Sequence, residues 1–367
     1  MSGEAGRLAP AALLVLFALT TGCSLFGGVR VETLASSTQK PSNVALYVGV
    51  TEGDQPLTDL EAKNFHIYEN GQELDPKQVG RMLLSRDLVT HERVLLLVDL
   101  SGNPSPERRA EYVQAVEAFV RKLRESLPVS VRAYDGSPGL KAVGDYPRGS
   151  TTFSAAPLLK ASSKDQSRDL NGAVVAGLAE LDRAAQGNAK PVELATLVVF
   201  AGGPDLAGRT SDDKLYEALE QTKHDVIGIG VGEDVPYLSF ARGGVIHSQN
   251  ADTLPIAFEE AGARVAATHA KYYLVAYCSP ARAGKRSVRL EVVHENKDGD
   301  ERSGSTDLEI DATGFGPGCS SETTPRFERP RTEARAEGDE GGARLNKSKS
   351  TDTGAVVPPP DTGEYAK

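Results

Sequence analysis

The sequence lacks a surplus of basic residues and contains little cysteine or histidine. Lysine and arginine number 41 against 51 aspartate and glutamate residues, which gives a formal net charge of −10. Nucleic-acid binding needs a basic footprint, and no predicted helix carries a run of lysine and arginine. No nucleic-acid partner is therefore predicted. The six histidines show no HExxH or similar spacing of metal ligands.

Long hydrophobic runs are also missing, apart from residues 8–19, which follow Arg7. This run is too short for a comfortable membrane span. It leads into Thr20-Thr21-Gly22-Cys23, which resembles the end of a bacterial lipoprotein signal peptide. Thr20 departs from that pattern, since an aliphatic residue is usual there. The alternative is an ordinary secretory signal peptide with a coincidental cysteine.

The lipoprotein resemblance implies that residues 1–22 are removed and that Cys23 becomes the acylated first residue, anchored in the lipid bilayer. Ser24 follows it, and a residue other than aspartate at this position implies sorting to the outer membrane. The expected location is therefore the cell envelope, on the periplasmic or the surface side. Residues 23–42 are rich in serine, threonine and glycine, and we predict that they form a tether.

The other two cysteines are Cys278 and Cys319. In an exported chain, such a pair is more typical of a disulfide than of a metal site. Closing a loop of about 40 residues would stabilise the fold by roughly 4 kcal/mol in the chain-entropy model. The alternative is two free thiols.

Two short β-rich segments flank the middle of the chain. The first, residues 43–90, contains strand patterns at 44–50 and 65–68, with a hairpin turn at Glu69-Asn70-Gly71. The second, residues 271–319, alternates with period two in several short runs. Neither segment is long enough to hold a core alone, so we predict that the two form one β-sandwich.

Between them, residues 91–270 alternate buried strands with amphipathic helices, which predicts an α/β domain with a mostly parallel sheet and helices on both faces. The clearest segments are strands at 94–98, 129–134, 194–200 and 225–231, and helices at 105–127, 170–181, 212–221 and 251–268. Residues 320–367 have few apolar side chains, which predicts a disordered tail.

The stretch Arg93-Val-Leu-Leu-Leu-Val-Asp-Leu-Ser-Gly-Asn103 carries the candidate site. It reads as a buried strand that delivers Asp99 and Ser101 to a loop. Ser105 then starts a helix as its capping residue. A carboxylate, a hydroxyl and a helix start at a strand's carboxyl end are typical of a ligand or metal site in an open parallel sheet.

These residues give the α/β domain a resemblance to the von Willebrand factor type A (vWA) family. Residues 99–103, Asp-Leu-Ser-Gly-Asn, match the start of that family's DxSxS metal-ion-dependent adhesion motif. Residues 194–205 are similar to its later strand and TDGxD-type loop, and residues 226–232 to the strand that follows. The flanking β segments resemble those of exported bacterial proteins with this domain. The resemblance implies the Rossmann-like vWA fold for residues 91–270.

The resemblance also implies a metal site, but the sequence departs from it. Asp99 and Ser101 are present, whereas Asn103 replaces the second serine. Arg168 stands near the place of a threonine ligand, and Gly202 replaces an aspartate. We therefore predict that Asp99, Ser101 and Asn103 form a degenerate metal site without a bound ion. A salt bridge from Arg168 to Asp99 is our hypothesis for what fills it.

The function predicted from these patterns is non-enzymatic and metal-independent binding of an unidentified protein partner in the cell envelope, with no cofactor. The predicted contact loops are residues 99–105, 153–170 and 201–210, with Asp99, Ser101, Asp169 and Asp205 as candidate contact residues. The first alternative is a Mg²⁺-dependent adhesion module. The remote alternative is a serine hydrolase, although Leu97 replaces the first glycine of a GxSxG elbow around Ser101.

Overall fold

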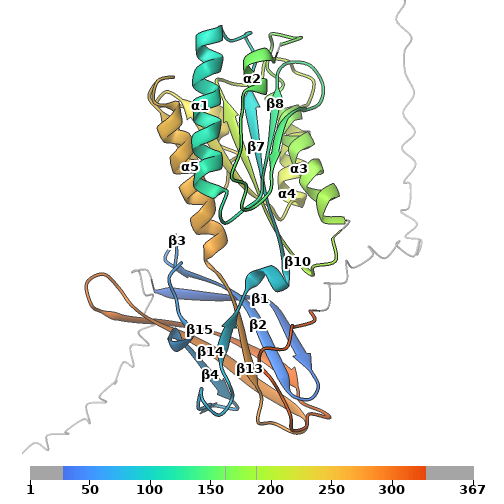
Figure 1. The fold of residues 1–367 in the computed structure, drawn as a ribbon, viewed down its shortest axis with the longest axis vertical. Coiled ribbons are helices and arrows are strands. Elements are labelled where there is room, and N and C mark those ends of the chain that lie inside the picture. Colours follow the sequence, from blue (N-terminus) through green and yellow to red (C-terminus); the bar gives the residue numbers. More distant parts are fainter. Residues whose placement is uncertain (1–27, 162, 187, 328–367) are drawn as a thin grey trace, which may run out of the picture. The chain divides into compact units, whose positions relative to one another are not determined.

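The computed structural model describes residues 28–161, 163–186 and 188–327, which belong to one compact unit. An α/β part is inserted between two β segments that pair with each other (Figure 1). The predicted signal peptide, Cys23 and tail residues 328–367 lie outside the described residues. Within the described part, no helix is long and apolar enough to cross a membrane.

The α/β part contains a six-stranded sheet in which every neighbouring pair is parallel except the last. The strand order is β12 (Val245–Ser248), β11 (Asp225–Val231), β10 (Val192–Ala201), β7 (Thr90–Asp99), β8 (Val129–Tyr134) and β9 (Lys141–Tyr146). The helices are α1 (Pro106–Leu123), α2 (Pro157–Lys160), α3 (Leu170–Gln186), α4 (Asp212–Gln221) and α5 (Leu254–Ala270), with the 3₁₀ turn η3 (Pro236–Leu238). The predicted fold class is confirmed.

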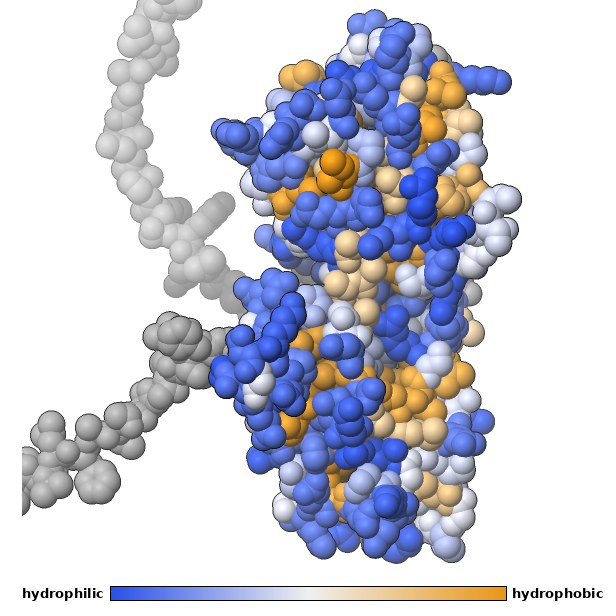
Figure 2. All heavy atoms as spheres, turned by 60° about the vertical axis from the view of Figure 1, so that its left-hand side comes forward, coloured by the Kyte–Doolittle hydropathy of each residue, from blue (hydrophilic) through white to orange (hydrophobic). Residues whose placement is uncertain are grey.

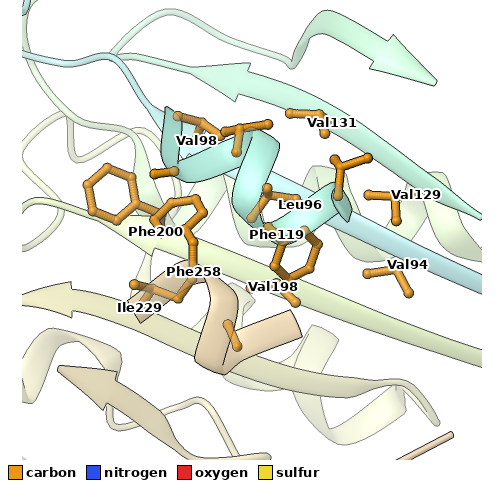
Figure 3. Close-up of a cluster of buried hydrophobic side chains, with 14 of the residues drawn as sticks. Val94, Leu96, Val98, Phe119, Val129, Val131, Val198, Phe200, Ile229 and Phe258 are labelled. Atoms are coloured by element: carbon orange, nitrogen blue, oxygen red, sulfur yellow. The ribbon is translucent and has the colours of Figure 1, made fainter. Parts of the chain in front are cut away.

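Strand β7 is buried on both faces, which explains its continuous apolar run. Alternate side chains point to opposite faces of a strand, so Val94, Leu96 and Val98 pack on α1 and α5, near Phe119 and Phe258 (Figure 3). Leu95 and Leu97 pack on the other face, in the cluster that includes residues of α3 and α4. Fully burying one such side chain contributes about 2 kcal/mol.

The flanking segments form two antiparallel sheets, which confirms the predicted sandwich. One sheet has the order β1 (Val29–Gln39), β2 (Asn43–Glu52), β13 (Tyr272–Cys278) and β6 (Met82–Leu84), with β3 (Gln55–Pro56) paired to β2. The other has the order β15 (Glu301–Asp311), β14 (Lys285–Glu295), β4 (Phe65–Glu69) and β5 (Gln72–Glu73). Each sheet draws strands from both segments, which is why neither segment could hold a core alone.

The tether prediction for residues 23–42 is wrong where the structure describes them. Residues 29–39 form β1, which pairs along its whole length with β2. Val29 and Val31 are buried, and exposed Arg30 lies between them. Serine and threonine on the rest of β1 fit a half-exposed edge strand, because their side chains hydrogen-bond readily at a sheet surface.

The disordered-tail prediction for residues 320–367 is wrong for its first residues. The Ser37 hydroxyl donates to the carbonyl of Arg326 at 2.7 Å, and the Phe327 ring is 8% exposed. Phe327 packs with Tyr47 and Leu274 on the outer face of the β1–β2–β13–β6 sheet. A single aromatic residue at the start of a polar segment therefore holds residues 320–327 on the sandwich.

Cys278 and Cys319 are joined in a disulfide, with their Cα atoms 5.8 Å apart. It ties the end of β13 to the segment that leads to Phe327. Elsewhere, α1 ends at Leu123 rather than at the predicted Leu127. Turns follow it, in which the backbone N–H groups of Ser126 and Leu127 both donate to the carbonyl of Leu123.

Two chain crossings join the α/β part to the sandwich, and one polar cluster holds both. Arg86, in the 3₁₀ turn η2 (Arg86–Leu88) before β7, donates to the carbonyl of His269 near the end of α5. Arg86 also pairs with Glu92 at 3.5 Å. The His269 ring contacts Glu92 at 3.4 Å and Thr196 at 3.0 Å. The cluster is buried, so its charges are compensated within the protein.

We predict that Gly304→Ala destabilises the protein by about 2 kcal/mol, a typical cost of overpacking. An added Cβ at Gly304 would lie 1.9 Å from the carbonyl oxygen of Val29, where β15 crosses β1. Urea denaturation measures the effect. Gly316→Ala is the control, since nothing lies within 4 Å of a Cβ there. Equal stability of the two variants would show that β1 does not pack against β15 in solution.

Candidate functional site

Asp99 ends β7 at the carboxyl edge of the parallel sheet, and its side chain is 3% exposed. Four donors surround its carboxylate. The backbone N–H of Ser101 donates to Oδ1 at 2.8 Å, and the Ser101 hydroxyl donates to the same oxygen. The backbone N–H of Gly202 donates to Oδ2 at 2.9 Å, and Arg168 Nε donates to Oδ2 at 2.5 Å. Both carboxylate oxygens of Asp99 are therefore hydrogen-bonded within the protein.

Arg168 lies in the loop before α3 and supplies the cation of the site. Its side chain is 14% exposed, and Nη1 donates to the carbonyl of Pro204 at 3.2 Å. Burial alone would lower the pKa of Arg168, but the Asp99 carboxylate outweighs it and raises the pKa above its usual value. The structure therefore places Arg168 against Asp99 as hypothesised from the sequence.

The residues present do not fit a metal ion. A hard cation such as Mg²⁺ needs several free oxygen ligands, but both oxygens of Asp99 already accept hydrogen bonds. The Asn103 amide oxygen accepts instead from Arg109 at 2.7 Å, and the Asn103 backbone is left-handed (φ 49°). Within the described residues, no group of three or more His, Cys, Asp or Glu side chains could hold a metal.

Two glycines after β10 make room for the guanidinium. A Cβ at Gly203 would lie 2.8 Å from Arg168 Nη1 and would push the guanidinium away. A Cβ at Gly202 would lie 3.5 Å from both Arg168 Nη2 and Asp99 Oδ2, an ordinary contact. An acidic side chain at position 202 could therefore approach the site. Because glycine stands there, Asp99 is the central carboxylate.

Buried aromatic side chains are packed near this ion pair. The Tyr134 hydroxyl donates to the carbonyl of Phe200 at 3.1 Å, and the rings of Tyr112 and Phe200 meet edge to face with centroids 5.3 Å apart. Burial raises the pKa of Tyr112 to about 12, and the Asp99 carboxylate adds to the rise. These tyrosines are therefore neutral at physiological pH and provide no further charge to the site.

Two further Asp-x-Ser loops lie at the carboxyl edge of the sheet, and the sequence analysis missed both. Asp135 is fully buried and accepts from Ser137 N at 2.9 Å, Lys164 N at 2.8 Å and Lys141 Nζ at 2.5 Å. Asp165 accepts from Ser167 N at 3.0 Å and Arg209 Nη2 at 2.8 Å. The repeated Asp-x-Ser spacing was the signal that could have identified them.

The remaining predicted carboxylates, Asp169 and Asp205, accept hydrogen bonds from backbone N–H groups nearby. Asp169 accepts from Gly172 N at 3.1 Å in the first turn of α3. Its burial raises its pKa above the usual value. Asp205 accepts from Asn171 N at 3.2 Å and Gly208 N at 2.9 Å. Neither carboxylate is hydrogen-bonded to the Asp99 cluster.

The surroundings of Ser101 do not activate its hydroxyl as a nucleophile. Its hydroxyl donates to the adjacent Asp99 carboxylate. Among the described residues, no histidine forms a hydrogen bond with Ser101; the His91 and His224 rings, for example, bond to Glu193 and Asp182. A serine hydrolase needs a base within hydrogen-bond reach of the hydroxyl, and this geometry does not supply it.

Two exposed leucines lie on the predicted contact loops, and the sequence analysis named neither. Leu206 is 66% exposed, and its backbone N–H donates to the carbonyl of Arg168 at 2.8 Å. Leu159, on α2, is 46% exposed, and its carbonyl accepts from Arg109 at 3.5 Å. Single exposed leucines are ordinary on a protein surface.

Comparison with known sequence families gives no match for this chain. Comparison with curated proteins gives none either. Solved structures with vWA folds are among those that resemble it. A von Willebrand factor type A protein from Catenulispora acidiphila is 13% identical over 78% of this chain and 74% of its own, with a TM-score of 0.36.

Two further similar structures are of metal-bound proteins. Manganese-loaded TRAP from Plasmodium vivax is 12% identical over 68% of this chain and 99% of its own, with a TM-score of 0.36. Proximal thread matrix protein 1 from the mussel byssus, with a zinc-occupied adhesion motif, is 15% identical over 55% of this chain and 49% of its own, with a TM-score of 0.35. Likeness at this level carries no argument about the site, which rests on its own geometry.

We predict that Asp99→Ala lowers the free energy of unfolding by about 3 kcal/mol in metal-free buffer, because it leaves the Arg168 cation buried without a partner. Arg168→Ala should also lower the free energy of unfolding, because it leaves the Asp99 carboxylate buried without a cation. The double variant should lose less than the sum of the two, with a coupling of about 2 kcal/mol by denaturation. The exposed pair Arg289–Asp307 is the matched control, with a smaller coupling expected. Additive losses at Asp99 and Arg168 would contradict the ion pair.

Asp135→Asn should destabilise the protein by about 2 kcal/mol at pH 7. Burial alone would raise the pKa of Asp135, but hydrogen bonds from Lys141, Ser137 and backbone N–H groups hold it well below its usual value. A depressed folded-state pKa contributes stability that is present above the unfolded pKa and is lost as pH falls through the folded value.

The stability gap between wild type and Asp135→Asn should therefore shrink as the pH is lowered below about 4, the ordinary range of an aspartate. Urea denaturation at neutral and acidic pH measures the gap. The exposed Asp252→Asn variant serves as the control. A gap that stays constant with pH would contradict a charged, hydrogen-bonded Asp135.

Proposed function

We propose that this protein is a non-enzymatic, lipid-anchored binding module of vWA type that contacts a protein partner of the cell envelope without a metal ion. The contact surface consists of the three loops at the carboxyl edge of the parallel sheet, residues 99–105, 153–170 and 201–210. The anchor is acylated Cys23, and the location is the outer membrane. The proposal on Cys23 depends on the sequence resemblance of the signal peptide.

The observation that carries the metal-independent function is the ion pair between Arg168 and Asp99. The guanidinium supplies the positive charge that a buried carboxylate at this edge requires. It also links all three loops, because its side chain reaches Asp99 and Pro204 while its backbone carbonyl accepts from Leu206. The loops are therefore held in one arrangement before any partner binds, which reduces the entropy lost on binding.

The exposed chemistry of these loops favours a protein as the partner. Leu206 and Leu159 present apolar side chains, while Asp135 and Asp165 are already paired with basic residues. An apolar centre with a satisfied polar surround is typical of protein interfaces. Figure 2 shows that, on the face drawn, hydrophobic residues of the α/β part lie in small groups between hydrophilic ones.

The corrected start of the fold changes how the anchor would act. Since β1 begins at Val29, only residues 24–28 separate it from Cys23. Five extended residues reach about 18 Å at most. An acylated Cys23 would hold the sandwich close to the bilayer, whereas the predicted tether to residue 42 would have given it much more reach.

A photo-crosslinking residue at position 206 tests this function in whole envelopes. We expect adducts with a protein partner at Leu206, and the same yield in excess chelator as in Mg²⁺, because the loop arrangement needs no ion. The control carries the same residue at Tyr216, which is 50% exposed on α4. Adducts at Tyr216 alone, or none at Leu206, would contradict the proposed surface.

A metal-dependent module is the other outcome of the same experiment, and it would lose its Leu206 adducts in chelator. Calorimetric titration with Mn²⁺ separates the two cases independently. We expect no binding heat from the natural chain. Arg168→Thr combined with Gly202→Asp is the positive control, since it removes the guanidinium and adds a carboxylate beside Asp99.

A further inference from the structure

A pocket of about 770 Å³ lies at the opposite edge of the parallel sheet, away from the loops discussed above. Its walls come from the amino ends of β7 and β8, the end of β9 and the segment before β10. Small-molecule sites in proteins usually have volumes of about 300–1,000 Å³. The pocket is therefore large enough for a small organic ligand.

Two of the four cations on the pocket wall are neutralised by carboxylates of the protein. Arg132 pairs with Asp145 at 3.0 Å and with Glu180 at 2.8 Å. Arg148 pairs with Asp87 at 2.5 Å. These arginines close the wall of the pocket and carry little net charge toward a ligand.

The other two cations, Arg93 and Lys190, form no ion pair within the described residues. Arg93 Nε donates to the neutral acceptor His91 Nε2 at 3.3 Å, and Lys190 Nζ donates to the carbonyl of Thr90 at 3.1 Å. Arg93 is partly buried. Its one side-chain hydrogen bond within the described residues uses Nε, so its terminal nitrogens donate to no described residue. Its charge also acts at longer range: burial alone would raise the pKa of Asp145, but hydrogen bonds from Ser130 and Arg132 lower it, and the charge of Arg93 adds to this effect.

The contact between Arg93 and His91 holds the guanidinium in place. His91 Nδ1 lies 2.8 Å from Glu193 Oε2, across the β7–β10 pairing. Because Arg93 can only donate, His91 Nε2 must offer a lone pair, and the ring proton must lie on Nδ1 toward Glu193. The resulting chain from Glu193 through His91 fixes Arg93 while leaving its terminal nitrogens to a ligand.

An apolar wall lies beside these cations. Pro128 and Pro147 line the pocket, together with Tyr146, whose hydroxyl donates to the carbonyl of Ser154 at 2.8 Å. An apolar wall beside a small number of placed polar groups is the usual composition of a small-molecule site.

We infer that this pocket binds a small organic acid, whose carboxylate or phosphate contacts Arg93 and Lys190 and whose apolar body lies on Pro128 and Pro147. The guanidinium of Arg93 is suited to two parallel hydrogen bonds with a planar oxyanion. The site is separate from the strand-end loops and does not depend on the proposed protein partner.

Calorimetric titration of the full chain in detergent tests the inference with benzoate and benzamide, which have the same shape but differ in charge. We expect benzoate to bind at least tenfold more tightly. Arg93→Gln should weaken benzoate binding about tenfold, which is the loss of one charge-assisted contact of about 1.4 kcal/mol. Arg93→Lys should recover part of the loss, since it restores the charge. Inorganic phosphate and phenyl phosphate distinguish the two oxyanions and the contribution of the apolar body.

Lys190→Gln is the second test variant, because Lys190 is exposed and its loss leaves the core intact. Arg302→Gln, on the sandwich strand β15, is the matched control and should bind as the natural chain does. Circular dichroism verifies that each variant is folded. Equal affinity for benzoate and benzamide, unchanged binding in folded Arg93→Gln and Lys190→Gln, or no binding by any probe up to about 10 mM, where a millimolar ligand would saturate, would each overturn the inference.

Discussion

A buried carboxylate must be paired with a positive charge, and at the end of β7 this requirement organises the whole candidate surface. Asp99 is 3% exposed, and desolvating an unpaired carboxylate would cost several kcal/mol. Arg168 supplies the charge from a different loop, and Gly202 supplies a backbone donor from a third. Three loops that are distant in sequence are therefore held together by one carboxylate.

The same constraint acts at the opposite edge of the sheet. Glu92 is buried where the chain crosses between the α/β part and the sandwich, and Arg86 and His269 surround it. Arg86 belongs to one crossing and His269 to the other, so the compensation of one charge also joins the two covalent connections. The buried carboxylates Asp99 and Glu92 thus hold loops at one edge of the sheet and chain connections at the other.

The sequence predicted those parts whose pattern is strong and local. Strand β11 and helix α4 match the predicted ranges, because each has an uninterrupted apolar or amphipathic pattern with clear ends. β1 was missed because its serine and threonine residues form no apolar run, and its strand state depends on pairing with β2. Asp135 was missed because its pairing with Lys141 depends on tertiary structure.

The residues at positions 168, 202 and 203 depend on one another. Arginine at 168 needs the space that glycine leaves at 203, where a Cβ would lie 2.8 Å from the guanidinium. An acidic residue at 202 would add a second carboxylate beside Asp99, and one guanidinium could not neutralise both. With glycine at both positions, the charge of Asp99 is balanced by a cation that belongs to the chain itself. Because Arg168 contacts Asp99, Pro204 and Leu206, the three loops are joined by contacts within the chain.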